Sequence, residues 1–462
     1  MTTVTTTQRD PSEGPLLHRC IREKGAALQV SKISAREIQR TEGATSVQAL
    51  QRVLYRSAKQ QPQRQFHALF DKVYRKDILT EAWKRVKVNA GAAGVDGVSI
   101  TDVIEQGVDG FLDDIAVELR ENRYHPKPLR RVDIPKPGQP GKFRPLSIPT
   151  VKDRVVMAAA KIVLEPIFEA NFKESSFGFR PKKNQYQAIE AVRKAVNAGK
   201  QYVLDADISN CFGEIDHNVL MKRIETRVSD QKMLKLIRMW LKVGVIQDGI
   251  NIDQDSGTPQ GSPISPLLSN IALDVLDEEW DEKRDGKLIR FADDSVVICA
   301  ARYQAEAAKN KMATILATLG LRLHPDKTRI VRIAFGKQGF DFLGFHFRMR
   351  KSWKWQRWYL NNWPSRRAMQ AIRDRIRDIT DRRFVGLPVN EIVERVNAAM
   401  ANWARYYRHG TSSTQFGAIH SYAHERLAIF TSNKHHKRGR NWVTTYNHAW
   451  SNRIGLMQLR CT

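Results

Sequence analysis

The spacing of apolar positions changes along the chain from a helical to an alternating pattern and back again. From about 47 to 87, apolar residues recur at helix-like intervals, which predicts helices. Between about 202 and 346, short alternating runs typical of strands are separated by helical stretches. Helical spacing returns at 365–383 and 389–408. We therefore predict an α+β domain of the split βαβ type, followed by helices.

Glycine, proline and polar residues interrupt these patterns and place the individual elements. Further predicted helices cover residues 104–121, 151–170, 187–197, 217–227, 233–243, 267–279 and 305–319. Predicted strands cover residues 129–134, 202–208, 330–333 and 340–345, and a strand hairpin covers 287–298. Residues 1–45 are polar and lack a clear period, so we expect a mostly flexible extension.

Two adjacent aspartates lie at the centre of the 287–298 hairpin. Apolar residues flank Asp293 and Asp294, which places both at a tight turn between two short strands. Adjacent carboxylates repel each other unless a positive group lies beside them, and a hard cation such as Mg2+ takes oxygen ligands. Taken alone, a solvated Asp-Asp turn is the simpler interpretation, and the rest of the chain decides between the two.

A second acidic pair lies on the predicted strand 202–208. Asp205 and Asp207 are two positions apart, so they share a face of the strand. If this strand lies beside the hairpin, Asp207, Asp293 and Asp294 can meet on one side of a sheet. Two-metal phosphoryl transfer needs such a cluster, in which one ion activates the attacking hydroxyl and the other neutralises the leaving pyrophosphate.

Prolines exclude a helix around residues 126–149 and favour another hairpin. Lys136 and Arg144 lie on or near its two arms. Cations that close on an anionic substrate are what a phosphate-gripping flap requires. Two solvated surface cations are the alternative interpretation.

The charge of the chain narrows the class of partner. A net charge of +27 and a pI near 10 indicate that the partner is a polyanion, and nucleic acid is the first candidate. No uncharged apolar run approaches the length that spans a bilayer, and the N-terminus does not resemble a signal peptide. Four separated cysteines exclude the usual zinc-finger spacing and suit a reducing cytoplasm, so we expect a cytoplasmic protein without a membrane partner.

Basic and aromatic residues alternate over residues 348–383. This run interleaves twelve arginines and lysines with Trp353, Trp355, Trp358, Tyr359 and Trp363. In a nucleic-acid groove, charge follows the backbone and rings can stack on bases, so we predict such a groove here. A solvated charged face is the alternative. A further basic cluster, 434–440, falls in a predicted loop.

The series of motifs resembles the reverse transcriptases encoded by group II introns, over roughly residues 89–445. The blocks that carry the resemblance, in the family's order, are Ile134-Pro135-Lys136 with Arg144-Pro145-Leu146, Gly178-Phe179-Arg180-Pro181, Asp205-Ala206-Asp207-Ile208, the stretch from Gly257 to Leu268, Phe291-Ala292-Asp293-Asp294, Leu319-Gly320-Leu321 with Lys327-Thr328, and Phe342-Leu343-Gly344-Phe345. The resemblance implies a right-hand polymerase, with the split βαβ-type sheet in its fingers and palm, followed by an α-helical thumb and maturase domain. The form implied lacks an HNH endonuclease domain, because the cysteine pairs of that domain are missing.

The resemblance also implies the residues of the catalytic centre. Asp207, Asp293 and Asp294, assisted by the Ile208 carbonyl, would hold two Mg2+ ions, and Lys327 could protonate the leaving pyrophosphate. Asp205 is an alternative to Asp207. The family keeps an aromatic that screens the 2′ position of the nucleotide, and Phe212, five residues past Asp207, matches that place and selects Asp207.

Further roles follow for the substrate and RNA contacts. Lys136 and Arg144 would grip the triphosphate, and Gln260 would line the nucleotide and template pocket. The primer end would rest on Phe342, Leu343 and Gly344. The implied RNA-binding residues are Arg366, Arg367, Arg373, Trp403, Arg405 and Tyr406.

The resemblance divides the chain into five parts. The parts are a flexible extension (1–45), a helical extension of the fingers (46–124), fingers and palm (125–346), thumb and maturase domain (347–445) and a C-terminal tail (446–462).

The sequence departs from the family pattern at some positions. Phe291 stands where the family usually has Tyr, and Met157 where Gln is frequent. Residues 182–186 are an unusual continuation after Pro181.

The expected function is that of an RNA-directed DNA polymerase that binds its own intron RNA, assists splicing and copies RNA into DNA by target-primed reverse transcription. Its partners would be the group II intron RNA, a DNA target or primer, and dNTPs, with the oligomeric state open. A splicing-only RNA-binding maturase is one alternative, against which the intact acidic residues argue. A domesticated reverse transcriptase serving defence or DNA repair is the other, and the DNA flanking the gene would distinguish it.

Overall fold

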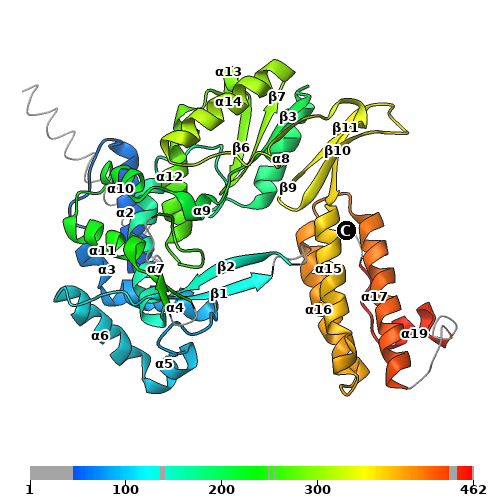
Figure 1. The fold of residues 1–462 in the computed structure, drawn as a ribbon, viewed down its shortest axis with the longest axis horizontal. Helices are drawn as coiled ribbons and strands as arrows, with labels where there is room; N and C mark the ends of the chain where they lie inside the picture. The colour runs from blue at the N-terminus through cyan, green and yellow to red at the C-terminus, as the bar shows by residue number, and fades with distance from the viewer. Residues whose placement is uncertain (1–44, 136–140, 248–249, 253–255, 436–444, 460–462) are drawn as a thin grey trace, which may run out of the picture.

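The computed structural model describes residues 45–135, 141–247, 250–252, 256–435 and 445–459 (Figure 1). The predicted extension 1–44 lies outside these ranges. So do Lys136 and residues 436–440 of the last basic cluster.

Helices form the N-terminal layer, and a long buried helix lies at its centre. This helix is α7 (Val151–Glu169), against which α2 (Ser46–Gln60), α3 (Phe70–Val73) and α4 (Lys76–Val88) pack. The single helix predicted for 104–121 is wrong: α5 (Ile100–Gln106) and α6 (Val108–Arg120) are separate. Gly107 divides them with a φ of +104°, a conformation that breaks a right-handed helix and suits glycine.

A small sheet extends from this layer as a flap. Its strands are β1 (Leu129–Pro135), β2 (Phe143–Ile148), β4 (Val245–Gln247) and β5 (Ile250–Ile252), in the order β2-β1-β4-β5. The predicted β1–β2 hairpin is present, and Ile134 pairs with Arg144. The two short strands β4 and β5 were not predicted. In Figure 1 the hairpin reaches across toward the C-terminal helices α15 and α16.

The central sheet contains the acidic strands. It is antiparallel, in the order β6-β7-β3-β8, and consists of β6 (Lys287–Phe291), β7 (Asp294–Cys299), β3 (Tyr202–Asp207) and β8 (Arg329–Arg332). Leu204 and Val297 on one face join the core that includes α12 (Ser265–Glu279) and α14 (Arg302–Thr318). Val203 and Ile298 on the other face pack with α8 (Gln185–Asn197).

Further helices follow in this part of the sequence. They are α9 (Cys211–Glu214), α10 (His217–Glu225), α11 (Gln231–Lys242) and α13 (Glu282–Asp285), of which α10 contacts α11 and α12 and α13 contacts α14.

A third sheet links the central sheet to the C-terminal helices. It consists of β9 (Gly339–Phe342), β10 (Phe345–Lys351) and β11 (Trp358–Pro364). The predicted strand 340–345 is wrong in part, because Leu343 and Gly344 form a turn with positive φ values of 50° and 77°. The basic and aromatic run, for which no strands were predicted, begins in the β10–β11 hairpin.

The C-terminal helices form a bundle with a core of its own. Ile372, Ile376 and Val396 pack there between α15 (Arg366–Ile379), α16 (Val389–Tyr407) and α17 (Ser413–Lys434). After α15 a separate 3-10 turn (Arg382–Phe384) follows, so the prediction of one helix over 365–383 is too long. Leu456, beyond α19 (His448–Arg453), is buried in the same core.

The α17 helix was not predicted. Lys434 is its last residue and not part of a loop, and its Nζ donates to the carbonyls of Val385 (2.8 Å) and Leu387 (3.0 Å). The whole arrangement confirms the predicted fold class, an α+β region followed by an α-helical domain.

The turn at Gly344 allows a test of how tightly the third sheet is joined to the bundle. Alanine at a left-handed φ costs ~1–2 kcal/mol, and a Cβ at Gly344 would also lie 2.7 Å from the hydroxyl of buried Tyr407. Gly455 is the matched control, because its φ is +80° and a Cβ there meets nothing within 4 Å. We expect both alanine variants to lower the Tm in differential scanning fluorimetry, Gly344→Ala by more. Equal losses would show that the Tyr407 contact does not constrain the joint.

Candidate active site

The turn between β6 and β7 brings the two adjacent aspartates to the end of the central sheet. Phe291 pairs with Asp294, so Ala292 and Asp293 form the turn and Asp294 is the first residue of β7. Ala292 has a φ of +59°. Glycine usually takes the first position of a two-residue hairpin with a positive φ, and alanine there is strained. The predicted hairpin is therefore present, and its backbone is held in an unfavourable conformation.

Strand pairing brings a third carboxylate to the same place. Asp207 on β3 is the cross-strand partner of Asp294 on β7, and Asp205 lies two residues earlier on the same face. Like charges directly opposite each other in a sheet are unfavourable. Loss of solvation, then the charges of Asp293 and Asp207, raise the pKa of Asp294 to about 7. The side chain keeps contact with solvent, but surrounding protein and neighbouring acids disfavour its charged form.

Cations from several elements offset this negative charge. Lys327 Nζ lies 2.8 Å from Asp207 Oδ2, and Arg329 Nε lies 3.1 Å from Asp205 Oδ2. Burial raises the pKa of Asp293, and the nearby Arg144 on β2 opposes that shift. Arg367 on α15 opposes the shift of Asp294 in the same way. The acidic centre is thus surrounded by positive charge from the flap, the sheet and the bundle.

The donor atoms fit a hard divalent cation, although the side chains are not arranged around one. Carboxylate oxygens are the ligands that Mg2+ prefers. Among the described residues, no three His, Cys, Asp or Glu side chains are grouped closely enough to hold a metal ion. Lys327 takes one Asp207 oxygen that such an ion would use.

The Ile208 carbonyl, the other predicted ligand, follows directly after β3. The hydrogen bonds around Ile208 use other atoms: Asp207 accepts from the His324 N–H (2.7 Å), and the Ser209 N–H donates to Arg322 (2.9 Å). The flanking backbone contacts therefore do not occupy the Ile208 carbonyl.

A cavity lies between the flap and the bundle, beside the acidic centre. It has a volume of ≈ 480 Å³, and its wall includes Arg144 and Leu146 of β2, and Gly344, Arg367 and Tyr407. The arginines in its wall are those whose charges act on the two turn aspartates. An anionic ligand in this cavity would therefore meet positive charge from both sides. Lys136, the second predicted flap cation, lies outside the described residues.

The loop from Gly257 to Ser262 connects the predicted nucleotide-binding residues. The Gln260 carbonyl accepts from the Ser147 N–H of β2 at 2.7 Å, and Thr258 N–H donates to the Phe212 carbonyl at 2.5 Å. Phe212 lies on the short helix α9 and is half-buried. The structure thus ties Phe212 and Gln260 to one loop next to the flap.

The predicted primer-end residues are fastened to the bundle. Phe342 is buried, and the Leu343 carbonyl accepts from the Tyr406 hydroxyl at 3.0 Å. The Gly344 carbonyl accepts from the Ser365 N–H at 2.9 Å. This turn and the start of α15 therefore form one unit.

The predicted RNA-binding residues fall into two groups. Arg366, Arg367 and Arg405 are exposed. Trp403 contacts the rings of Tyr407 and Phe416, and Tyr406 stacks on Phe345 at 5.7 Å. The packing of these two aromatic residues between the third sheet and the bundle accounts for them without RNA.

Arg373, the remaining predicted RNA-binding residue, is half-buried and lies over the ring of Tyr422 on α17. Other basic and aromatic groups lie outside the set of RNA-binding residues that the resemblance implied. A groove of ≈ 660 Å³ between α15 and α16 is lined by Arg375, Arg383 and Arg395 among others. On the β10–β11 hairpin, the side chains of Trp353 and Trp355 are 92% and 68% exposed. The sequence signal for these basic and aromatic surfaces was the high content of arginine, lysine and tryptophan in residues 348–383.

The departures from the family pattern have defined neighbours. The Phe291 ring lies 6.3 Å from that of Phe179, and the Met157 sulfur accepts from the Ser262 hydroxyl at 3.1 Å. Tyr186, at the end of the unusual continuation, lies 3.8 Å from the His409 ring on the bundle. Phe291 thus packs near Phe179 beside the acidic turn, Met157 contacts the 257–262 loop, and Tyr186 contacts the bundle.

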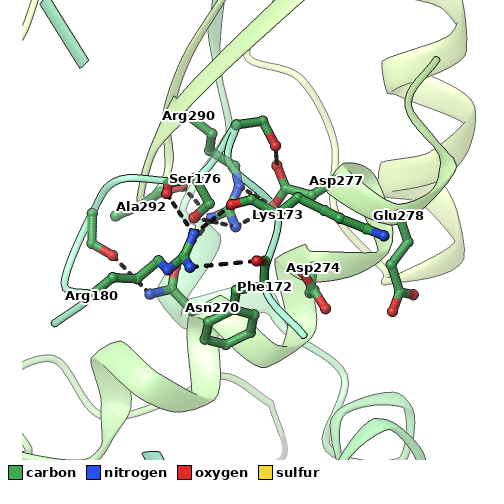
Figure 2. A network of polar contacts seen from close by, with 12 residues as sticks. Phe172, Lys173, Ser176, Arg180, Asn270, Asp274, Asp277, Glu278, Arg290 and Ala292 are labelled. Atoms are coloured by element: carbon green, nitrogen blue, oxygen red, sulfur yellow. Dashed lines mark hydrogen bonds and ion pairs between the residues drawn. The ribbon is translucent and has the colours of Figure 1, made fainter. Parts of the chain in front are cut away.

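A buried charged layer beneath the turn was missed by the sequence analysis. Arg290 of β6 and Asp277 of α12 form an ion pair in which neither side chain is exposed. Asp274, one helical turn before Asp277, is also buried, and Figure 2 shows it pointing away from Arg290. The one available signal was an arginine inside the apolar strand Lys287–Phe291.

Comparisons with known proteins show which family the chain belongs to. The family model described as reverse transcriptase (RNA-dependent DNA polymerase) matches residues 134–347, and that described as group II intron, maturase-specific domain matches residues 369–448. Protein YkfC of Escherichia coli (strain K12) is 32% identical over 346 residues, which cover 66% of this chain and 89% of YkfC. The group II intron-encoded protein LtrA of Lactococcus lactis subsp. cremoris is 35% identical over 217 residues, covering 46% of this chain and 35% of LtrA.

A solved structure, the partial Cas6-RT-Cas1--Cas2 complex, shares 25% identity with a TM-score of 0.35, over 54% of this chain and 41% of that one. The chain belongs to the family of group II intron reverse transcriptases and maturases, which confirms the resemblance found in its motifs. None of the helices in the described ranges is both long and apolar enough to cross a membrane.

The buried layer predicts a pH-dependent stability. Burial, then the charges of Asp277 and Glu278, raise the pKa of Asp274 to about 7. The folded protein therefore keeps this proton up to about pH 7, whereas the unfolded chain releases it near the ordinary value of 3.8. Stability is lost as the pH rises through this window, because ionisation favours the unfolded chain. Asp274→Asn should thus raise the Tm at pH 8 by more than at pH 5.

Glu105→Gln on α5 is the control for this prediction, because Glu105 is exposed and is not among the charges that raise the pKa of Asp274. Its Tm difference from the wild type should change little between the two pH values. A Tm difference for Asp274→Asn that is the same at pH 5 and pH 8 would show that Asp274 is ionised in the folded protein throughout.

Proposed function

We propose that this protein is an RNA-directed DNA polymerase encoded by a group II intron, which copies RNA by target-primed reverse transcription and binds its intron RNA to assist splicing. The observation that carries the proposal is the pairing of Asp207 with Asp294 beside Asp293, at the open end of a sheet and next to an arginine-lined cavity. Phosphoryl transfer needs such a concentration of carboxylates beside cations that bind phosphate.

Asp207, Asp293 and Asp294 would hold two Mg2+ ions, with the Ile208 carbonyl as a further oxygen donor. When bound, these ions would lower the pKa of the primer hydroxyl and neutralise charge on the reacting phosphate. Lys327 holds its ammonium beside Asp207, where a proton can be given to the leaving pyrophosphate. Arg329 forms an ion pair with Asp205. Asp207 would then be the acid of β3 that binds metal together with Asp293 and Asp294.

The flap and the 257–262 loop would bind the incoming dNTP. Arg144, which lines the cavity, would grip the triphosphate. Lys136 would assist it, and Gln260 would line the nucleotide and template pocket. Phe212 would crowd a ribose 2′-hydroxyl and so favour deoxynucleotides. The Phe342–Gly344 turn would support the primer end, a task for which its hydrogen bonds to the bundle suit it.

The exposed arginines of the bundle would contact intron RNA phosphates. Arg366, Arg367 and Arg405 are the candidates on α15 and α16, and the exposed tryptophans of the β10–β11 hairpin offer rings for stacking. A splicing-only maturase and a domesticated enzyme of defence or repair remain the competing functions, and the intact acidic centre favours a polymerase over the first. We place the protein in the cytoplasm, where its RNA is made and spliced.

Removing both hairpin aspartates should separate the two activities. Asp293→Ala with Asp294→Ala removes two of the three carboxylates, so we expect primer extension on an RNA template to fall by at least ~10²–10³-fold, the loss typical of one electrostatic catalytic group. Binding and splicing of the intron should persist, because they use the RNA-binding surface. The measurements are primer extension, and splicing at low magnesium.

The matched control is the adjacent pair Asp113 and Asp114, exposed on α6. Its double alanine variant should extend primers like the wild type. If the Asp293 and Asp294 variant still extended a primer, the catalytic assignment would be wrong. If splicing were lost together with extension, the separation of the two activities would fail.

The RNA-binding proposal predicts a steep salt dependence. The log-log slope of affinity against salt should be several units, at ~0.7–0.9 per neutralised phosphate. Arg366→Ala with Arg367→Ala should reduce the slope by ~1.4–1.8 if each arginine contacts one phosphate. The measurement is fluorescence anisotropy of labelled intron RNA between low and physiological salt.

The control variant replaces Lys283 on α13 and Lys309 on α14, which are equally exposed but lie on the far side of the central sheet from the flap (Figure 1). It should leave the slope unchanged. Equal slopes for both double variants would show that Arg366 and Arg367 do not bind RNA phosphates.

A further inference from the structure

Arg290 is buried directly below the catalytic turn. Its side chain has no exposure to solvent, and it lies on β6 two residues before Ala292. Its Nε donates to Asp277 at 2.9 Å and its Nη2 to the Ser176 hydroxyl at 2.9 Å. Its Nη1 donates to Asn270 Oδ1 at 3.2 Å and to the Ala292 carbonyl at 3.1 Å (Figure 2). One guanidinium thus connects the turn to α12 and to the loop at 176.

The turn is held from its other side by Gly178. A Cβ at Gly178 would lie 2.3 Å from the Ala292 nitrogen, so only glycine allows this approach. The Gly178 carbonyl accepts from Asn270 Nδ2 at 2.9 Å. Arg290, Asn270, Gly178 and Ala292 therefore form a closed ring of contacts, in which Gly178 approaches the peptide group before Ala292 and Arg290 binds the peptide group after it.

This ring holds the residue whose backbone is strained. Ala292 has a positive φ, which is unfavourable for a residue other than glycine, so the surrounding contacts must maintain it. Asp293 follows directly, and Asp294 is the next residue. A rotation of the Ala292 peptide would change the position of Asp293 and of the start of β7, and so their placement relative to Asp207.

We propose that Arg290 is a positioning residue: through the Ala292 carbonyl it fixes the turn and so the relative placement of Asp293, Asp294 and Asp207. This inference rests on the proposed function for its catalytic consequence. The competing interpretation is a buried ion pair that only stabilises the fold. Such pairs contribute little net stability compared with apolar residues of similar size. Here the guanidinium also donates a hydrogen bond to the Ala292 carbonyl of the turn, which an ion pair with Asp277 alone does not require.

The experiment compares lysine substitutions at two buried arginines. Arg290→Lys keeps a positive charge for Asp277 but lacks the planar fork that reaches Ala292 and Asn270 at the same time. Arg227 is the control, because it is 4% exposed and also donates to backbone carbonyls, those of Pro62 and Ala58, remote from the turn. Both substitutions are expected to lower the Tm.

Two readouts distinguish positioning from stability, each taken where all variants are folded. For Arg290→Lys we expect kcat for single-nucleotide addition to fall ~10–100-fold, because small misplacements of reacting groups lower the rate by up to ~10²-fold. The Kd for the primer–template duplex should be unchanged. We also expect weaker Mn2+ binding in an EPR titration. Arg227→Lys should match the wild type in both readouts.

A double variant keeps the proposal testable if Arg290→Lys does not fold. Arg290→Met with Asp277→Leu replaces the buried pair by apolar side chains, which proteins often tolerate. It should fold, yet keep the defects in kcat and Mn2+ binding. Recovery of both readouts in the double variant, or wild-type values in Arg290→Lys, would overturn the proposal.

Mn2+ binding and primer extension by the wild-type protein test this proposal and the proposed function separately. A wild-type protein that binds Mn2+ but extends no primer would reject the polymerase, and the Mn2+ comparison would still decide the function of Arg290. A wild-type protein that binds no Mn2+ would reject the positioning of a metal site by Arg290.

Discussion

The repulsion between Asp207 and Asp294 is the constraint on which the rest of this structure depends. Six successive residue pairs, from Tyr202 with Cys299 to Asp207 with Asp294, set the register of β3 and β7. A shift by one residue would exchange the two faces of the sheet, so the core does not allow the acids to move apart. The two carboxylates therefore stay opposite each other, and the charge must be compensated by other parts of the chain.

Each compensating cation comes from a different element. Arg144 lies on the flap, Lys327 on the loop before β8, Arg329 on β8 and Arg367 on α15. The acidic centre is thus the point at which the separate parts of the molecule interact electrostatically. The link between the turn at Leu343 and Gly344 and the bundle adds a direct mechanical connection at the same place.

Much of this arrangement was predictable because its signals are local. The alternation around Asp293 and Asp294 predicted the hairpin, and the alternating run at 202–208 predicted the strand that carries Asp205 and Asp207. Elements with weak local signals were missed: β4 and β5 are only three residues long, and the buried side of α17 includes Ala423, Thr431 and Ser432, which obscure its apolar period. The contacts of Arg290 with Asp277, Asn270 and Ser176 were also unpredictable, since these three partners lie 13 to 114 residues away in the sequence.

The Lys327–Asp207 ion pair gives the acidic centre a counterion of its own. The chain holds this ammonium at a high effective concentration, so any divalent cation that takes the same oxygen must displace it. Cation affinity is therefore lower than the carboxylates alone would give, and occupancy of the site and freedom of Lys327 are thermodynamically linked. A cation that took this oxygen would therefore also free the Lys327 ammonium beside the acidic residues.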